Sequence, residues 1–555
     1  MSPRVIDSNK IHYEKPELND FLVQYNEILA EILVENFESF SYLASATINR
    51  LEAQTHFFER VEKYIQLRHM LEKEPELTVR LIDVDHFLYE SLSSEFGVRV
   101  ITDSRKHIKK WRFLPRYLLL LIYNLFFSLV GMLLARKYKK KEYDYIIRSY
   151  FDFRNVGERL REEYFGQVAE DLAKEYRTLV VFKLLQRKDL LLFIKVHKTA
   201  IFDACLLESF LSPWSVIKAF IRYLGSHVYL HKKVTYKGHD VTSLLQRSLD
   251  EDFYLMKGIG VYLEYEAAKK ITELNPKRIM FPYENQTWEK VYPYVRKELQ
   301  RDVFILGYIH SGFSYKLLIF FPTSLEGKLP IFPDKIVTMG EISTRILKEK
   351  ASYLCEIVTG AALRQTKHID NEQVKRERFP IKPTSDRIER KIAYAFSYDR
   401  EKYNAIIASL LRVFKNTSIL VYLKFHPDFD ESDILRHLGF SLPSNFIPAR
   451  SIPWGKIYSS VDLILYDDNS IGIEGIINGV KTFMYNVAEP VYNCERFFYF
   501  DTYRSDIYEN DLIKICEELV KGTFIKEMPV EKISDYINQY YHVYTREGCF
   551  KIFTD

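Results

Sequence analysis

A long uncharged segment constrains this chain more than any other feature of its sequence. Between Arg116 and Arg136 the run YLLLLIYNLFFSLVGMLLA is apolar except at Asn124, Ser128 and Gly131. It reaches the roughly 18 residues that a helix needs to cross a membrane. Because it is apolar all round, it is not typical of an amphipathic surface helix. Basic clusters, KHIKKWR and RKYKKK, flank it on both sides.

The pattern around this segment argues against a simple crossing of a bilayer. The stretches LTVRLIDVDHF, YESLSSEFG and VRVITDS predict strand, helix and strand before it, and YDYIIRSYF predicts a strand just after it. We expect these strands in one sheet, which a single crossing would divide. Positive charge on both flanks gives no orientation signal. We therefore predict that residues 105–141 contact a membrane surface, with 116–136 entering one leaflet and the basic flanks on anionic headgroups. A spanning helix and a buried core helix are the alternatives.

Composition bounds the class of protein. With 555 residues, 47% of them hydrophobic, the chain can bury the cores of several domains. A net charge of +4 gives no support for nucleic-acid binding, so we predict no nucleic-acid partner. The five cysteines show no metal-ligand spacing and indicate reduced thiols in a cytosolic protein, and the polar N-terminus excludes a signal peptide.

Short β-rich runs alternate with amphipathic helical patterns over most of the chain. This alternation predicts parallel sheets covered by helices, and a polar, charged stretch with two prolines interrupts it once. The predicted fold class is α/β, with two Rossmann-type domains facing across a cleft. The predicted limits are a helical N-terminal region at 1–75, a first domain at 76–375 with the apolar insert 116–136, a linker at 376–390, a second domain at 391–510 and a C-terminal helical segment at 511–555.

The stretch FPYENQTWEK places many polar groups where the predicted strand RIMFPYE ends. It contains Glu284, Asn285, Gln286, Trp288 and Glu289. A polar turn that caps a helix is the simpler interpretation. Planar amides and carboxylates also pair with hydroxyl groups, and an aromatic face packs against C–H groups. The alternative interpretation is therefore a pocket for a hydroxyl-rich ligand.

The second domain contains another constellation at strand ends. The strand ILVYLKFHPD ends at Lys424, His426 and Pro427, and ligands of open parallel sheets bind at such carboxyl ends. Lys424 and His426 suit a phosphate or a carboxylate, although a lone surface histidine is common. Further on, VDLILYDDNSIGIEG predicts a strand followed by a helix. Asn469 or Ser470 would cap that helix and leave backbone N–H groups for an anion.

Glu474, inside the helix that follows, could accept hydrogen bonds from a ribose. The neighbouring pair Asp467 and Asp468 fits ordinary turn chemistry. It would also fit a metal site, but no third ligand is evident, and we predict neither a metal nor a cofactor.

These segments resemble the donor half of GT-B glycosyltransferases with an HP motif and a later serine-then-glutamate motif, which include bacterial sialyltransferases, Kdo transferases and polyol-phosphate polymerases. In the first domain, PYENQTWE, LGYIHSGF, FFPTSLEGKLPIFPDKIVTMG and EIVTGAALR follow one another in an order similar to the bacterial surface carbohydrate biosynthesis protein family. The resemblance runs from about Pro282 to Tyr485 and implies a sugar transferase of the outer polysaccharide.

The resemblance implies roles for the polar strand ends. Glu284, Asn285, Gln286, Trp288 and Glu289 would bind the acceptor together with Ser311. Either Glu284 or His310 would be the general base, and the sequence leaves this choice open. Arg364, at the end of TGAALR, could reach the donor phosphate, although a solvated arginine fits equally well. The resemblance assigns Lys424, His426, Pro427, Asn469, Ser470 and Glu474 to donor binding.

The expected protein is therefore a cytoplasmic-face glycosyltransferase attached peripherally or monotopically to the inner membrane. Its expected partners are a nucleotide-sugar donor, with a CMP-activated acidic sugar as one candidate, and a lipid-linked or oligosaccharide acceptor. Two alternatives remain: transfer of a polyol phosphate from a CDP-alcohol, and a non-catalytic scaffold of a polysaccharide assembly complex.

Overall fold

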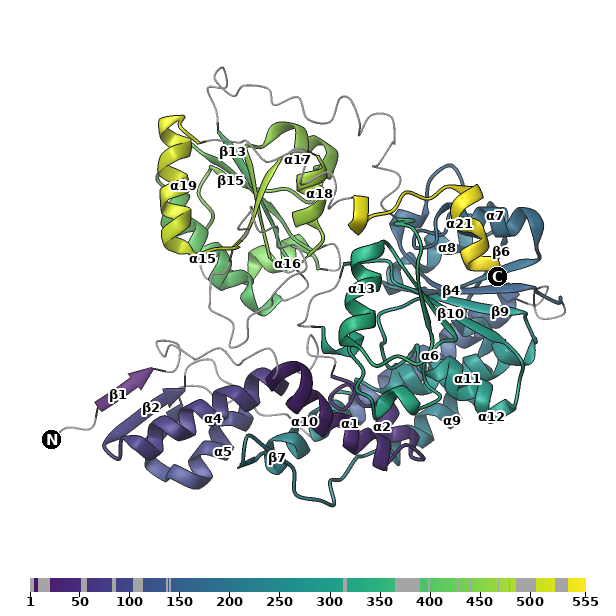
Figure 1. The fold of residues 1–555 in the computed structure, drawn as a ribbon, viewed down its shortest axis with the longest axis horizontal. Helices are drawn as coiled ribbons and strands as arrows, with labels where there is room; N and C mark the ends of the chain where they lie inside the picture. Colours follow the sequence, from purple (N-terminus) through teal and green to yellow (C-terminus); the bar gives the residue numbers. More distant parts are fainter. Residues whose placement is uncertain are drawn as a thin grey trace.

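The structure is a computed structural model of the whole chain. It describes residues 4–7, 20–50, 57–81, 86–102, 113–135, 138, 141–312, 317–364, 390–397, 400–426, 429–438, 441–467, 469–478, 480–485, 506–524 and 538–555. Most of the predicted linker 376–390 lies outside these residues, as do Pro427 and Asp468. Two α/β bodies and a smaller N-terminal unit make up the described chain (Figure 1).

The larger body is built on a seven-stranded sheet in which every neighbouring pair is parallel. Its strand order is β12-β11-β10-β9-β4-β5-β6. The strands are β4 Tyr145–Phe151, β5 Thr178–Leu184, β6 Asp203–Leu206, β9 Arg278–Pro282, β10 Phe304–Tyr308, β11 Lys335–Thr338 and β12 Glu356–Thr359. Most of their residues are buried, as expected for a sheet covered on both faces.

Helices cover both faces of this sheet (Figure 1). They are α6 Phe113–Ala135, α7 Gln167–Glu175, α8 Leu190–Val196, α9 Pro213–Leu224, α11 Ile259–Glu273, α12 Val291–Leu299, α13 Glu341–Lys350 and, from the C-terminus, α21 Arg546–Thr554. Helix α10 Thr242–Tyr254 and the short hairpin of β7 Thr235–Tyr236 and β8 His239–Asp240 pack instead with the N-terminal unit. Strand order reverses between β4 and β9, because the chain leaves β4 toward β6 and returns beside β4 at β9. This is the doubly wound arrangement, whose ligands bind at the point of reversal.

The second body repeats the arrangement with six parallel strands in the order β15-β14-β13-β16-β17-β18. Its strands are β13 Lys391–Ala395, β14 Leu420–Lys424, β15 Phe446–Pro448, β16 Leu463–Tyr466, β17 Lys481–Tyr485 and β18 Asp506–Ile507. Its helices are α15 Tyr403–Phe414, α16 Glu431–Arg436, α17 Trp454–Ser460, α18 Ile471–Ile477 and α19 Glu509–Lys521. The reversal falls between β13 and β16. Two doubly wound sheets confirm the predicted GT-B-like α/β fold class.

The N-terminal unit differs from the prediction in its sheet. The strands β2 Leu77–Leu81 and β3 Val100–Thr102 and the helix α5 His86–Phe96 form as expected. They pair with β1 Arg4–Asp7 in a separate three-stranded parallel sheet, so the expectation that they share a sheet with β4 was wrong. The remaining helices are η2 Asp20–Tyr25, α1 Asn26–Glu35, α2 Phe40–Ala44 and α4 Phe57–Lys73.

The C-terminal residues divide between the two bodies. Helix α19 belongs to the second body, where Arg412 donates to Glu509 at 2.8 Å. Residues 538–555 pack against the first body, where Arg278 donates to the Phe553 carbonyl at 3.0 Å and Tyr544 donates to Asp171 at 3.0 Å.

The two bodies share one contact region in the described chain. Ile473 and Ile476 of α18 belong to the same buried cluster as Tyr540 and Tyr541 of the C-terminal segment, and that cluster is the core of the first body. The C-terminal segment therefore connects the two bodies by packing as well as by sequence.

Candidate active site

The loops after β4, β9 and β10 meet at the carboxyl edge of the first sheet, where the strand order reverses. The β9 loop begins the FPYENQTWEK stretch and leads into α12. The β10 loop carries His310 and Ser311, and the β4 loop carries Asp152 and Arg154. Because β9 lies between β4 and β10, these loops are neighbours.

Glu284 and His310 form the centre of this edge. His310 Nε2 lies 3.5 Å from Glu284 Oε1, and their side chains are 9% and 31% exposed, respectively. Gln286 donates its side-chain amide to the other oxygen of Glu284, Oε2. The carboxylate is therefore held on one side by an amide and faces an imidazole on the other, while part of its surface remains open to a ligand.

Two arginines act on this pair. The Arg364 guanidinium lies 5.5 Å from the centre of the Tyr164 ring, and the edge of that ring meets His310 with ring centres 4.7 Å apart. Arg154 is held by Asp152, to which its Nε donates at 2.7 Å. Both positive charges oppose protonation of His310. This edge of the sheet therefore combines a carboxylate, an imidazole and two guanidinium groups, which suits an anionic, hydroxyl-bearing ligand.

Burial and these charges shift both central pKa values. Desolvation, with help from Arg364 and Arg154, lowers the pKa of His310 to about 3, so the imidazole is neutral at physiological pH. Desolvation raises the pKa of Glu284, although Gln286, Arg364 and Ser311 act in the opposite direction. A general base is most effective with a pKa near the working pH. The shifts thus favour Glu284 over His310 as the proton acceptor.

Three of the predicted acceptor-binding side chains are buried and support the loop. Trp288 is 6% exposed, its indole N–H donates to Gln286 at 3.1 Å, and the Arg148 guanidinium lies 4.3 Å from its ring centre. The indole ring is thus enclosed by protein, and little of it is exposed for stacking against a sugar. Arg148 is itself paired with buried Glu264, at 2.8 Å and 3.0 Å.

Asn285 and Glu289 likewise shape the turn. Asn285 is fully buried at φ +58°, a left-handed conformation that asparagine tolerates better than most residues, and its amide donates to the Ile319 carbonyl. Glu289 Oε2 accepts the backbone N–H groups of Glu284 and Gln286 at 2.9 and 3.1 Å. These residues therefore form a polar turn that positions Glu284, but no side chain of the turn caps α12.

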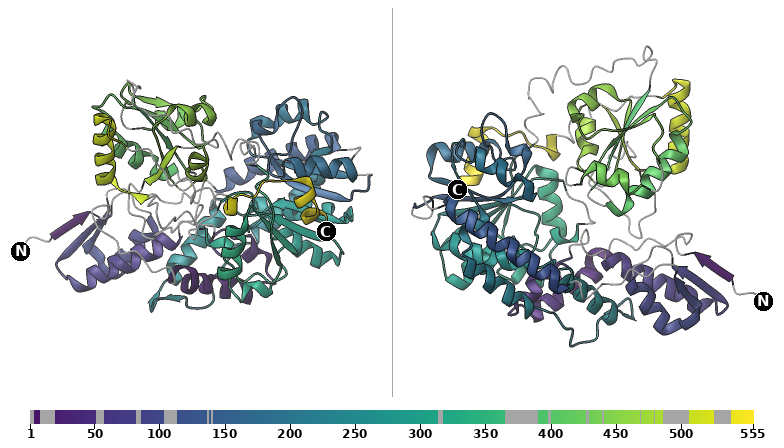
Figure 2. Two further views of the ribbon diagram at one scale, coloured as in Figure 1. Left: turned by 45° about the horizontal axis from the view of Figure 1, so that its top comes forward. Right: turned by 180° about the vertical axis from the view of Figure 1, so that it is seen from behind.

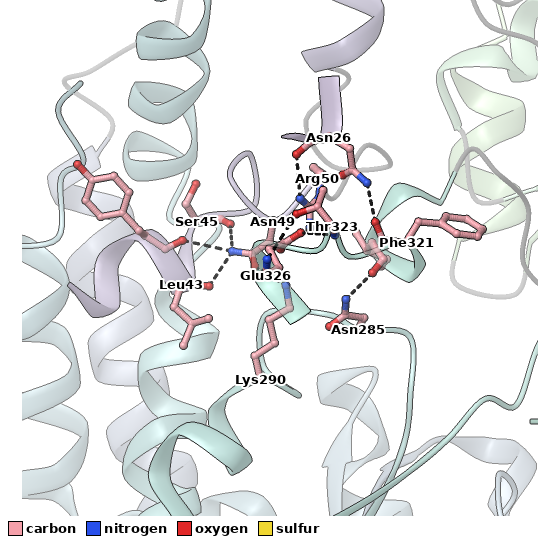
Figure 3. Close-up of polar contacts among 12 residues, drawn as sticks. Asn26, Leu43, Ser45, Asn49, Arg50, Asn285, Lys290, Phe321, Thr323 and Glu326 are labelled. Atoms are coloured by element: carbon pink, nitrogen blue, oxygen red, sulfur yellow. Dashed lines mark hydrogen bonds and ion pairs between the residues drawn. The ribbon is translucent and has the colours of Figure 1, made fainter. Parts of the chain in front are cut away.

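A buried polar network lies behind this loop (Figure 3). Arg50 donates to Glu326 at 2.6 Å, and neither side chain has any exposed surface. Lys290 donates to Asn49 at 2.7 Å, and desolvation lowers the pKa of Lys290 to about 8. Through these contacts the N-terminal helices are joined to the segment that follows Glu284 and Glu289.

Most of the predicted donor residues of the second body are hydrogen-bonded to other groups of that body. The Lys424 ammonium donates to the carbonyls of Ala449, Arg450 and Ile452 at 2.9, 3.0 and 2.6 Å. An ammonium has three donors, so Lys424 secures the β15–α17 loop instead of facing a phosphate. His426 follows β14 and is half-buried, with its ring 6.1 Å from that of Phe429.

The loop after β16 is bound to the strand beside it. Asn469 donates to the Ala395 carbonyl at 2.9 Å and accepts the Ile471 N–H at 3.0 Å, so it caps α18. Ser470 donates to Glu474 at 2.9 Å, and Tyr458 donates to the other oxygen of Glu474 at 3.2 Å.

Two glycines in SIGIEG bring α18 close to the sheet. A Cβ at Gly472 would lie 2.4 Å from the Tyr466 ring, and one at Gly475 would lie 2.5 Å from the Thr482 side chain. These glycines therefore serve close helix–strand packing, which places Glu474 near the sheet edge.

Sequence reasoning missed Asp152, Arg154 and Tyr164. A signal was present, because FDFRN follows the buried strand YIIRSYF directly, as PYENQ follows its own strand. A Cβ at Gly307 would lie 2.8 Å from the Tyr283 ring, so this glycine makes room for that ring. Within the residues that the structure describes, no three His, Cys, Asp or Glu side chains form a metal-binding group.

No protein-family model matches the chain, and no curated protein matches it. Solved structures with similarity include UDP-GlcNAc 2-epimerase from Neisseria meningitidis bound to UDP-GlcNAc, at 12% identity and a TM-score of 0.37, over 74% of this chain and 98% of that one. The wall teichoic acid polymerase TagF matches at 11% identity and 0.38, over 78% and 93%. The calicheamicin glycosyltransferase CalG4 matches at 10% identity and 0.35, over 72% and 99%. Similarities this low say nothing about activity.

Proposed function

We propose that the chain is a glycosyltransferase of bacterial surface polysaccharide biosynthesis, which transfers a sugar from a nucleotide-activated donor to a lipid-linked or growing glycan. The observation that carries the proposal is the Glu284–His310 pair at the reversal point of the first sheet, with Arg154 and Arg364 beside it. The motif order from PYENQTWE to DDNSIGIEG supports the same reaction class.

The chemistry assigned to the pair is proton removal from the acceptor. As the acceptor oxygen bonds to the anomeric carbon, its proton passes to Glu284, and the bond from that carbon to the donor phosphate oxygen breaks. The nucleotide leaves with that electron pair. Neutral His310 can orient the acceptor hydroxyl through a hydrogen bond, and the guanidinium groups of Arg154 and Arg364 stabilise the developing negative charge.

For the donor we propose a CMP-activated acidic sugar, bound at the reversal point of the second sheet by His426, Ser470 and Glu474. A CDP-alcohol donor is the competing possibility. Metal independence is part of the proposal, because arginines and backbone N–H groups would hold the leaving phosphate.

We also propose that the protein works on the cytoplasmic face of the inner membrane. The structure contains one helix long and apolar enough to cross a membrane among its described residues, Phe113–Leu134, with a mean hydropathy of 2.2 and 22% of its most apolar window buried. An apolar helix on the first body would keep the acceptor-side edge close to a lipid-linked glycan.

A thermal-shift panel of CMP, UDP, GDP, CMP-sugars, UDP-sugars and CDP-glycerol tests the proposal. A ligand at about 100 times its Kd stabilises the fold by about 2.7 kcal/mol and raises Tm by several degrees. We expect CMP and a CMP-sugar to raise Tm. A response to UDP alone would overturn the choice of donor, and a response to CDP-glycerol alone would favour polyol-phosphate transfer. No change in Tm with any of these compounds would overturn the proposal that the chain is a nucleotide-dependent transferase.

A further inference from the structure

We propose that α6 and α9 form one apolar surface that lies flat on a bilayer, so that α6 runs in the plane of the membrane interface and does not cross it. The inference rests on the proposed function only in expecting a membrane partner. The surface includes α9, which does not belong to the apolar run.

The chain on the two sides of α6 belongs to one folded unit. Before α6, Tyr42 donates to the Tyr229 carbonyl at 3.1 Å. Arg60 pairs with Glu251 at 3.0 Å, and Tyr236 donates to buried Glu62 at 2.7 Å. Residues from both sides also share a buried apolar cluster. A single crossing by α6 would place these partners on opposite sides of the bilayer, which these contacts exclude.

One face of α6 is fixed against the first body. Tyr117, Phe127 and Ser128 are buried, and a Cβ at Gly131 would lie 2.7 Å from the backbone of Glu208 and Ser209, just after β6. Seen from behind, the helix lies along the outside of this body (Figure 2). A helix fixed in this way is already packed along its length, which suits it to lie on a membrane rather than to span one.

The opposite face of α6 is apolar and exposed. Its large side chains there are 47–66% exposed, and none of them is charged. They are Leu114, Leu118, Leu119, Ile122, Phe126, Leu129 and Leu133. Their spacing of three and four residues makes a continuous stripe. An exposed apolar stripe this long marks a contact with a membrane or with another protein.

Helix α9 extends the stripe. It packs beside α6, where the rings of Tyr117 and Phe220 meet edge to face with centres 5.1 Å apart. Trp214, Ile221 and Leu224 on α9 are 69%, 59% and 47% exposed, at spacings that put them on one helical face. Tryptophan is enriched at the membrane–water interface. Trp214 is therefore the interfacial anchor that we assign to this surface.

The rim of the surface carries positive charge, which favours a bilayer as the occupant. Arg187 stacks on α6, with its guanidinium 3.6 Å from the centre of the Tyr123 ring. Exposed Lys188 precedes α8, exposed Lys195 lies in it, and exposed Lys198 follows it. An apolar face with a cationic rim fits a membrane with anionic headgroups. A second copy of this chain would bring like charges together and is the less suitable occupant.

The orientation also places the candidate active site. Tyr123 and Gly131 of α6 lie at the carboxyl ends of β5 and β6, and Glu284 and His310 lie at the same edge of the same sheet. A bilayer beneath α6 would run along this edge, where a lipid-linked acceptor can reach the site.

Vesicle flotation of the full-length protein tests the surface. The vesicles are phosphatidylcholine alone, or phosphatidylcholine with phosphatidylglycerol. We expect binding to the anionic vesicles and at least a tenfold loss of partitioning in Trp214→Glu and in Ile122→Glu. Val98→Glu is the matched control, because Val98 is 91% exposed on the N-terminal unit, and it should bind as the wild type does.

Wild-type binding by Trp214→Glu would overturn the two-helix surface. Absence of vesicle binding, together with dimers that Trp214→Glu dissociates, would assign the surface to a second copy and overturn the membrane proposal. The nucleotide thermal shifts should be unchanged in these variants. A failed vesicle test therefore leaves the transferase proposal standing, and a silent nucleotide panel leaves this one standing.

The orientation has its own test. Single cysteines introduced at Val98, before α6, and at Leu354, after it, are both highly exposed at 91% and 76%. Labelling of the parent protein, which has five native cysteines, gives the background. Above this background, a membrane-impermeant maleimide should label both introduced cysteines from the same side of a sealed membrane. Labelling from opposite sides would overturn the in-plane orientation.

Discussion

The reversal points of the two sheets have the same topology and different chemistry. In the first sheet, Arg154, Glu284 and His310 lie in the loops after β4, β9 and β10. Arg364, which follows β12, lies close enough to act on both Glu284 and His310. In the second, Ser397 donates to Asp467 at 2.6 Å, and Asn469 donates to the Ala395 carbonyl at 2.9 Å. The first point gathers two guanidinium groups around Glu284 and His310, whose pKa values are shifted, whereas the second is bridged by hydrogen bonds between its own loops.

This difference shows that a polar residue at the end of a parallel strand does not by itself identify a ligand site. A polar side chain after a parallel strand lies near a ligand only if the neighbouring backbone does not use it first. Lys424 donates hydrogen bonds to three backbone carbonyls. The Glu284 side chain stays partly exposed because Glu289 accepts the backbone N–H groups of its loop. We therefore assign the proton chemistry to the first edge and expect the second edge to bind its ligand through less charged contacts.

Removing the proposed base should have the largest effect. Glu284→Gln keeps the contact with Gln286 in shape but cannot accept a proton, and we expect a loss of about 10²–10⁴ in kcat. Glu474→Gln, the matched change at the second edge, should raise KM for the donor more than it lowers kcat. The measurement is the initial rate of nucleotide release from the donor that shifts Tm. Equal losses of kcat in both variants would contradict the assignment of proton transfer to the first edge and donor binding to the second.

Breaking the network behind the first edge should cost nearly as much in stability. Arg50→Met leaves Glu326 buried without its ion-pair partner, so we expect a loss of about 3–5 kcal/mol in the free energy of unfolding. The double change Arg50→Met with Glu326→Leu should recover most of that loss. Chemical denaturation measures both. A double variant as unstable as the single one would show that packing, not charge, holds the loop.

The pH dependence of stability should report the burial of His310. Its pKa is about 3 in the folded protein and about 6.5 when unfolded. Between these values the unfolded chain binds the extra proton, so stability rises with pH across this window and is lost on acidification. At pH 5 this proton uptake by the unfolded chain lowers the free energy of unfolding by about 2 kcal/mol relative to neutral pH. His310→Gln should flatten the wild-type slope between pH 4 and 6 by about one proton, and an unchanged slope would contradict the assigned burial.

Lys424 should matter to stability and not to catalysis. Lys424→Met leaves three carbonyls without this donor, and we expect a loss of about 1–2 kcal/mol in the free energy of unfolding. Exposed Lys415, changed to methionine, is the control and should be nearly neutral. A Lys424→Met protein of normal stability that no longer binds nucleotide would restore Lys424 as a donor ligand.

Arg364, unlike Lys424, should matter to ligand binding and not to stability, and its replacement should have the smallest effect of these changes. Arg364→Ala removes a cation beside His310 and Glu284, and we expect about a tenfold weaker donor affinity, which corresponds to about 1.4 kcal/mol, with little change in Tm. Because Arg364 also depresses the pKa of His310, that pKa should rise in the variant. Titration of the imidazole by NMR and of the ligand by calorimetry would check both.

Much of the fold could be predicted, since strand and helix periodicity are local properties. The strands predicted in RIMFPYE, ILVYLKFHPD and VDLILYDD form as β9, β14 and β16. The pairing of β2 and β3 with β1 was missed, because sheet membership depends on contacts between distant segments. The site was predicted in part, for the same reason: strand ends are visible in sequence, while burial of Trp288 and capture of Lys424 are not.

The sequence alone determined two doubly wound α/β domains, an uncharged helix and polar groups at named strand ends, because each follows from residue type and spacing. Only the tertiary structure decided which of those groups meet. It brought Arg154 from the β4 loop to His310, covered Trp288 with Arg148, and placed the chain on both sides of α6 in one core. Distances between residues far apart in sequence are set by packing, and packing decides which carboxylate remains open to a ligand.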